Sequence, residues 1–230
     1  MEYQINNSSE VDNWKEVILV YNSALKEIGT KLEILNDEFQ HVHRYNPIEH
    51  IKSRIKTSES IVKKLKKNGY ESTIENMVKY VNDIAGIRII CSFTTDIYRI
   101  AEMLANQNDV KVLAVKDYIK NPKPSGYKSY HMIVSIPVFL SDRIIEAKVE
   151  VQIRTVAMDF WASLEHQLKY KQNIPNQQEI IAQLKDCAEV IHATDNKMLG
   201  IRQQIEQASD LPTEEEILFE KLSRLDITLE

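Results

Sequence analysis

Hydrophobic residues recur every three or four positions across two long stretches of the chain, which is the period of an α-helix. In the first stretch, from Ser9 to about Phe39, apolar side chains fall at Trp14, Val17, Ile18, Tyr21, Leu25, Ile28, Leu32 and Leu35. The same period returns from Val156 to about Lys171, and the chain from Gln177 onward is helical in pattern and increasingly acidic. We therefore predict helices at both ends of the sequence.

Two further helices are expected between the first helix and the centre of the chain. Asn46-Pro47 breaks the first helical pattern, and a second helical zone is predicted from Ile48 to about Lys67, closed by Asn68-Gly69. A short helix is predicted from Ile74 to Tyr80.

The central part of the chain changes to apolar and β-branched runs that are typical of strands. We predict a helix over Asp96–Ala105 and strands over Gly86–Phe93, Val110–Tyr118, Tyr130–Phe139 and Ala147–Thr155. The links between the last three strands are too short for a helical crossover, so antiparallel pairing is expected there, with Arg143 in the final turn.

This order of elements predicts an α/β (α+β) fold, in which a mixed β-sheet is flanked by helices and carries helical extensions at both termini. We expect residues 1–45 to form an N-terminal helix and residues 46–172 a single core domain. Residues 173–230 are expected to form a C-terminal helical extension suited to oligomerisation.

Composition narrows the class of protein. Of 230 residues 43% are hydrophobic, which is enough for a core, and the net charge of −5 argues against a general nucleic-acid binder. Cys91 is expected to be buried, and the absence of a CxxC pair argues against a thiolate zinc site. The N-terminus lacks a basic and apolar leader and no apolar run approaches the ~20 residues of a membrane span, so a cytoplasmic location is expected.

Basic residues of this acidic chain are concentrated between positions 51 and 68. They are Lys52, Arg54, Lys56, Lys63, Lys64, Lys66 and Lys67, against the single acid Glu59. Lys56, Ser60 and Lys64 are spaced by four, so they share one face if the segment is helical. Such a face suits a polyphosphate; the alternative is an ordinary solvated helix surface.

Charged residues also interrupt the predicted strands. Asp83 precedes one strand, where a carboxylate could hold Mg²⁺, and Arg88 lies inside it, which is costly unless it is paired or faces a cleft. Glu150, Gln152 and Arg154 alternate with apolar residues and therefore point to one face of the sheet. Together these positions suggest a polar cleft. The alternatives are a structural Asp83–Arg88 pair and an ordinary amphipathic strand.

The loop from Asn121 to His131 is basic and aromatic, and it contains two of the chain's six prolines and one of its five glycines. Tyr127 could stack on a base, since every base presents a π-face, and Lys123 and Lys128 could hold phosphates. The chain has no P-loop motif, so any phosphate site is of another kind. The alternative is a loop without a ligand.

Taken together, five motifs resemble one family. They are R-x-K-x-x-x-S-I-x-x-K from Arg54, D-I-A-G-I-R from Asp83, S-G-Y-K-S-Y-H from Ser125, E-V-Q-I-R-T from Glu150 and A-M-D-F-W-A-S-L-E-H-x-L-x-Y-K from Ala157. They stand in the order found in alarmone synthetases of the RelA/SpoT type. The length of the chain, without a His-Asp hydrolase motif, is similar to that of the small alarmone synthetases.

The resemblance implies a nucleotidyltransferase-like fold and transfer of the β,γ-pyrophosphate of ATP to the 3′-hydroxyl of GDP or GTP, with Mg²⁺, giving ppGpp or pppGpp and AMP. By resemblance, the adenine lies between Arg54 and Arg88, and the ATP phosphates contact Lys56, Ser60 and Lys64. Mg²⁺ is held by Asp83 and Glu150, and Glu150 is also the general base.

On the acceptor side, the resemblance implies that Tyr127 stacks on guanine and that Asp159 accepts hydrogen bonds from the guanine edge. The phosphates and ribose are lined by Lys123, Ser125, Lys128, His131, Gln152 and Arg154. Members of the family assemble as homotetramers through terminal helices, and the apolar faces here permit the same. A non-catalytic nucleotide- or RNA-binding module on the same fold is the alternative function.

Overall fold

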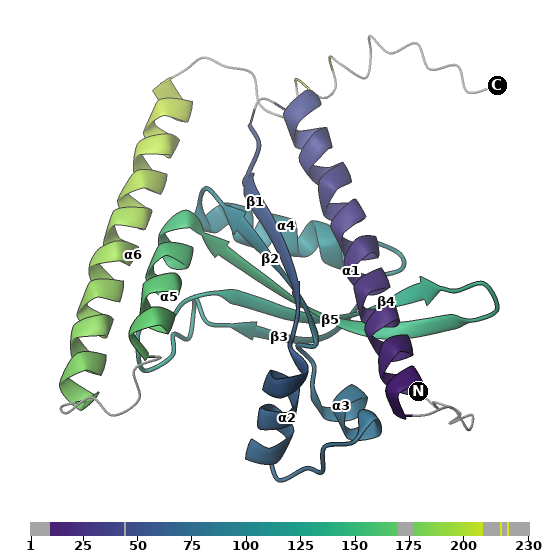
Figure 1. Cartoon of the computed structure of the whole chain (residues 1–230). Coiled ribbons are helices and arrows are strands. Elements are labelled where there is room, and N and C mark those ends of the chain that lie inside the picture. The colour runs from purple at the N-terminus through teal and green to yellow at the C-terminus, as the bar shows by residue number, and fades with distance from the viewer. Residues whose placement is uncertain (1–9, 44, 170–176, 209–216, 218–219, 221–230) are drawn as a thin grey trace.

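The computed structural model describes residues 10–43, 45–169, 177–208, 217 and 220, and contains a five-stranded sheet with helices around it (Figure 1). The elements are, in chain order, α1 (Glu10–His41), β1 (Ile48–Ile55), α2 (Ser58–Lys67), α3 (Ile74–Tyr80), β2 (Ala85–Cys91), α4 (Thr94–Ala105), β3 (Lys111–Asp117), β4 (Tyr130–Phe139), β5 (Ile144–Thr155), α5 (Val156–Lys169) and α6 (Gln177–Ala208). The predicted mixed α/β fold is confirmed.

The strand order is β1-β2-β5-β4-β3, and only the central β2–β5 pair is parallel. The predicted antiparallel pairings of β3 with β4 and of β4 with β5 are confirmed. In the β2–β5 register Gly86 lies opposite Glu150 and Arg88 opposite Gln152. Opposed residues share a face of the sheet, so the polar residues of both strands meet on one side.

The prediction of a single helical zone from Ile48 to Lys67 is wrong. Residues Ile48–Ile55 form the edge strand β1, and the helix starts only at Ser58, after an N-cap in which the Thr57 side chain accepts from the Ser60 backbone N–H. Three isoleucines of β1 are spaced by three and four, which imitates a helix, but the hydrogen bonds to β2 decide the conformation. Lys56 therefore precedes α2 and does not share a helical face with Ser60 and Lys64.

One hydrophobic core lies between the sheet and helices α1 and α4. Apolar side chains of α1, among them Ile28, Leu32 and Phe39, join Ile97, Ile100 and Leu104 of α4 in the same buried cluster as Val149, Val151 and Ile153 of β5. Cys91 is in this cluster, as expected. Because side chains alternate along β5, Glu150, Gln152 and Arg154 face the opposite side.

The terminal helices are confirmed for the residues that the structure describes. Helix α1 crosses the sheet, and α6 lies beside α5 (Figure 1). The acidic tail, predicted as part of the helical extension 173–230, lies outside the described residues beyond Ala208, apart from Ile217 and Glu220. None of the described helices combines the length and the apolar character that crossing a membrane requires.

Candidate functional site

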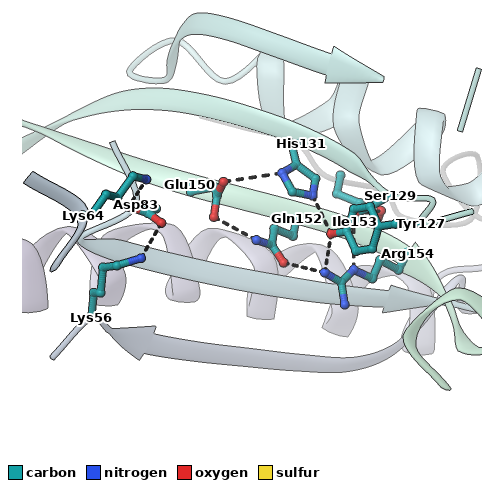
Figure 2. A network of polar contacts seen from close by, with 10 residues as sticks. All are labelled: Lys56, Lys64, Asp83, Tyr127, Ser129, His131, Glu150, Gln152, Ile153 and Arg154. Atoms are coloured by element: carbon teal, nitrogen blue, oxygen red, sulfur yellow. Dashed lines mark hydrogen bonds and ion pairs between the residues drawn. The ribbon is translucent and has the colours of Figure 1, made fainter. Parts of the chain in front are cut away.

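Asp83 is held by two lysines, Lys56 from the link between β1 and α2 and Lys64 from α2 (Figure 2). Its Oδ2 accepts from Lys56 Nζ at 2.7 Å, and its Oδ1 accepts from Lys64 Nζ at 2.8 Å. Burial alone would raise the pKa of Asp83, but the hydrogen bonds and charges of the two lysines outweigh it and hold the pKa below its ordinary value. The alternative of a structural Asp83–Arg88 pair is therefore wrong.

The local sequence explains how α2 presents Lys64 to Asp83. Ile61 and Leu65 are spaced by four and are buried, which fixes the face of α2 that contacts the core. Ser60 lies in the first turn, where its hydroxyl accepts from Thr57 Oγ1 at 2.8 Å. The N-terminal turn of a helix carries backbone N–H groups without intrahelical partners and favours anions, so Ser60 lies where a phosphate could bind.

Glu150, Gln152 and Arg154 form a chain of hydrogen bonds along the polar face of β5. Gln152 Nε2 donates to Glu150 Oε2 at 2.8 Å, and Arg154 Nη2 donates to Gln152 Oε1 at 2.9 Å. A second chain runs through the 121–131 loop, where Arg154 Nη2 donates to Tyr127 Oη at 2.6 Å and Tyr127 Oη lies 2.9 Å from His131 Nε2.

His131 closes this network, because its Nδ1 lies 3.4 Å from Glu150 Oε1. Arg154 is a donor only, so the Tyr127 hydroxyl accepts from it. In the tautomer of His131 whose Nε2 accepts the Tyr127 proton, Nδ1 carries the proton that faces Glu150. Burial and the charge of Asp83 act to raise the pKa of Glu150, but the bonds from His131 and Gln152 hold that pKa below its ordinary value.

Two arginines from adjacent strands lie on the same polar face. Arg54 on β1 is paired opposite Gly86, and its side chain packs over that glycine, next to Arg88. The charge of Arg54 helps to lower the pKa of Arg88, although burial is the larger cause. The buried Arg88 Nε has no hydrogen-bond partner among the described residues, so it remains a donor for a ligand.

Asp159, in the first turn of α5, contacts an arginine from each of the strands β2 and β5. Its Oδ1 accepts from Arg88 Nη1 at 3.2 Å and from Arg154 Nη1 at 3.1 Å. Direct contacts thus link seven of the sequence-predicted residues in one network: Arg88, Tyr127, His131, Glu150, Gln152, Arg154 and Asp159.

The 121–131 loop is folded inward rather than open. Tyr127 is only 9% exposed, and its ring packs against Tyr118, His131 and Trp161. Lys123 Nζ lies 4.6 Å from the centre of the Tyr127 ring, the guanidinium carbon of Arg154 lies 5.1 Å from it, and Ser125 is buried. The Tyr127 ring is therefore covered by cations in this arrangement, and stacking on a base requires the loop to move.

Sequence reasoning missed the contribution of α6 to this loop. Gly126 has φ of 87°, and a Cβ added there would lie 2.5 Å from the Cβ of Ala188 on α6. Trp161 Nε1 donates to the backbone oxygen of Leu184 at 3.0 Å. Asp195 Oδ2 accepts from Thr155 Oγ1 at 2.8 Å. The glycine in the loop and the tryptophan on α5 were the available signals in the sequence, but neither shows which segment packs against them.

Comparison with known proteins identifies the family of this chain. The sequence pattern described as the region found in RelA / SpoT proteins matches residues 53–175. The chain belongs to the RelA/SpoT family. All the residues predicted for the site, from Arg54 to Asp159, lie inside this RelA/SpoT region, whereas α6 follows it.

Relatives in the RelA/SpoT family match most of the chain. GTP pyrophosphokinase YwaC of Bacillus subtilis (strain 168) is 47% identical over 196 residues, which is 85% of this chain and 93% of the relative. The crystal structure of small alarmone synthetase 1 from Bacillus subtilis bound to its product pppGpp superposes with a TM-score of 0.77 at 34% identity, covering 84% of this chain and 98% of the other. The same synthetase bound to AMPCPP gives a TM-score of 0.71 at 31% identity, covering 85% and 99%.

Proposed function

We propose that this protein is a GTP pyrophosphokinase that transfers the β,γ-pyrophosphate of ATP to the 3′-hydroxyl of GDP or GTP, giving AMP and ppGpp or pppGpp. The observation that carries the proposal is the position of Glu150. It lies on the polar face of the sheet between Asp83 with its two lysines and the ring of acceptor-loop residues. Names of close relatives, and the nucleotides bound in two solved structures of the family, support the same reaction.

The ATP half of the proposed site is formed by β1, β2 and α2. The planar guanidinium groups of Arg54 and Arg88 lie near each other on one face and suit stacking on adenine. The phosphate contacts are assigned to Lys56, Ser60 and Lys64. The triphosphate would replace Asp83 as the partner of the two lysines, which frees the carboxylate of Asp83.

The acceptor half of the proposed site is formed by the 121–131 loop, β5 and the start of α5. Tyr127 is assigned to the guanine ring and Asp159 to the guanine edge, where a carboxylate can accept two N–H bonds. The ribose and phosphates are assigned to Lys123, Ser125, Lys128, His131, Gln152 and Arg154.

Asp83 and Glu150 fit a magnesium ion. The charge of Asp83 acts directly on the pKa of Glu150, so the two carboxylates are close, and both pKa values are held low, which keeps them ionised at neutral pH. In the part of the chain that the structure describes, no group of three or more His, Cys, Asp or Glu side chains could hold a metal ion. Mg²⁺ commonly uses one or two carboxylates together with substrate phosphates, which suits this pair. When bound, it would neutralise charge on the transferred group.

Glu150 is the proposed general base. The 3′-oxygen of the acceptor forms a bond to the β-phosphorus of ATP, and the bond from that phosphorus to the α,β-bridging oxygen breaks, so that AMP leaves. The proton of the 3′-hydroxyl passes to Glu150 and then to water. Hydrogen bonds from His131 and Gln152 orient the carboxylate for this transfer.

We also propose that the protein is a cytoplasmic homotetramer. Exposed apolar side chains form stripes on the terminal helices: Val156, Phe160, Leu164 and Leu168 on α5, and Val190, Met198, Ile201 and Ile205 on α6. Such stripes are suited to helix–helix contacts between copies. Light scattering of purified protein tests the mass, with a tetramer expected and a monomer at all concentrations contradicting the assembly.

The experiment that tests the function is chromatography of nucleotides after incubation of purified protein with ATP, GDP or GTP, and Mg²⁺. AMP and the guanosine product should appear in equal amounts, and only when both nucleotides are present. The purified product should not be hydrolysed at its 3′ position by this protein. Tight nucleotide binding without any product would instead indicate the non-catalytic module.

A further inference from the structure

Helix α6, outside the RelA/SpoT region, contacts the acceptor half of the site at several points, three of which involve Ala188, Leu184 and Asp195. Ala188 packs on Gly126, Leu184 accepts from Trp161, and Asp195 accepts from Thr155. Of these contacts, only the last is a hydrogen bond between two buried side chains. Thr155 is fully buried and Asp195 is 8% exposed.

The Asp195–Thr155 bond bears on the start of α5. Thr155 ends β5, directly after Arg154, and its Oγ1 accepts from the backbone N–H of Met158 at 3.1 Å. A hydroxyl has one proton, and Thr155 gives that proton to Asp195. This leaves the lone pairs of Oγ1 aimed at the first turn of α5. A carboxylate acceptor polarises the hydroxyl, which strengthens the bond that the hydroxyl accepts.

The first turn of α5 positions two residues of the acceptor half. Asp159 follows Met158 and accepts from Arg88 and Arg154. Trp161 packs on Tyr127 with ring centres 6.4 Å apart. A shift of this turn would therefore move the contacts of both Asp159 and Tyr127. On the ATP side it would reach Arg88 through Asp159, whereas Lys56, Lys64 and Asp83 lie in other segments of the chain.

Asp195 is also linked to the 121–131 loop by charge. A buried carboxylate is costly unless it is paired, and burial raises the pKa of Asp195. The charges that favour its ionised form come from His192, on the same helix, and from Lys128, in the loop.

We propose that Asp195 is a positioning residue of the acceptor-nucleotide site, acting through Thr155 on the first turn of α5. The inference rests on the proposed assignment of the 121–131 loop to GDP or GTP. It adds a residue from α6 to a site whose other members all come from the RelA/SpoT region.

Steady-state kinetics with each nucleotide varied in turn test this role. Asp195→Ala removes the acceptor of the Thr155 proton, and the KM for GTP should rise roughly ten- to 100-fold, the range for losing a hydrogen bond to a charged group. The KM for ATP should stay within about threefold. Asp195→Asn keeps an oxygen that accepts from Thr155, so it should restore most of the affinity for GTP. Asp186→Ala, an exposed aspartate on the same helix, is the matched control and should leave both KM values unchanged.

Variants of Thr155 show whether the effect passes through this hydroxyl. Thr155→Val should raise the KM for GTP as Asp195→Ala does, and Thr155→Ser should not. The double variant Asp195→Ala with Thr155→Val should be no worse than the worse single variant, because both break the same contact. Additive effects would overturn the inference. These Thr155 variants also test it if Asp195→Ala fails to fold.

A variant of Arg202 distinguishes a specific role of Asp195 from a general weakening of the packing of α6. Its guanidinium lies 3.7 Å from the centre of the Tyr45 ring and pairs with Asp96, so it anchors α6 elsewhere on the molecule. If Arg202→Ala gave the same selective rise in the KM for GTP, Asp195 would act only by docking α6, and the inference would be wrong.

Tyr127→Ala distinguishes a failure of this inference from a failure of the proposed function. If it impairs GTP use while Asp195→Ala does not, this inference fails and the proposed function stands. If it spares GTP use, the assignment of the loop itself fails.

Discussion

Arg154 and Glu150, four residues apart on β5, are joined by two separate chains of hydrogen bonds. One chain passes through Gln152, and the other passes through Tyr127 and His131 (Figure 2). Arg154 Nη2 donates to both chains, and Glu150 receives one chain on each carboxylate oxygen. The proposed base is therefore linked to the proposed guanine-stacking residue.

Replacement of Glu150 by glutamine should abolish most of the activity. Glu150→Gln keeps the size of the side chain but removes the base and a metal ligand, so kcat should fall by roughly 10²- to 10⁴-fold. Circular dichroism should show a folded protein. Turnover within a few-fold of the wild-type rate would exclude Glu150 from the chemistry.

Replacement of Tyr127 should separate the two nucleotides. Loss of one base–aromatic stack costs about 1–3 kcal/mol, so Tyr127→Ala should weaken GTP binding roughly five- to 150-fold while ATP binding changes by less than about threefold. Arg88→Ala should show the opposite bias. Titration with fluorescent analogues of each nucleotide measures both.

Tyr127→Phe is the control for the hydroxyl. It keeps the ring that stacks but breaks the contacts with Arg154 and His131, so its loss of GTP affinity should be smaller than that of alanine. Equal weakening of ATP and GTP by Tyr127→Ala would mean that the loop is not specific to the acceptor.

The pairing of Asp83 with two lysines should make the stability of the fold depend on pH, with a sign that follows from its pKa. The pKa of Asp83 in the folded protein lies below the ordinary value of 3.8, so its pairing with Lys56 and Lys64 adds stability above that pH. This contribution is lost as the pH falls through the lower, folded-state pKa. Asp83→Asn should therefore be less stable than wild type in urea unfolding at pH 7, and the difference should shrink below about pH 3.8.

Asp186→Asn, at an exposed position on α6, is the control for this titration and should show no such difference at either pH. A gap between Asp83→Asn and wild type that stayed constant down to pH 2–3 would mean that the lysine pairs contribute nothing to the stability of the fold.

Gly126 should not tolerate a side chain. Its positive φ costs other residues roughly 1–2 kcal/mol, and the added Cβ of Gly126→Ala would clash with Ala188. We expect lower stability and weaker GTP binding. The double variant Gly126→Ala with Ala188→Gly should recover the part of the lost GTP affinity that is due to Ala188, although the new Cβ would still lie 3.3 Å from Lys185 Cα. Gly29→Ala, in α1 with nothing near the new Cβ, should instead stabilise the protein by about 0.5–1 kcal/mol in thermal unfolding.

Local patterns predicted most of the fold. The bounds of α3 and β4 were predicted as they are observed, because each has a clear period and flanking turn residues. The pattern of β1 predicts a helix and not the observed strand, since the strand is stabilised by pairing with β2, thirty or more residues away in sequence. Sequence pattern alone cannot show such partners.

For the site, motif resemblance predicts that Asp83, Glu150 and the 121–131 loop act together, and this assignment stays a prediction. The resemblance could not show that Lys56 and Lys64 meet at Asp83, nor that Asp195 reaches Thr155 across 40 positions of sequence. Those contacts depend on how the helices dock, which is set by the three-dimensional packing of the core.

The fate of the β-phosphate of ATP tests the central claim most directly. With Mg²⁺, GTP and ATP labelled with ³²P at the β-position, the account predicts that the label moves to the guanosine product together with the γ-phosphate. Label at the α-position should remain entirely in AMP. Appearance of the β-label in ADP or in free phosphate, with an unlabelled guanosine nucleotide, would contradict pyrophosphate transfer by this site.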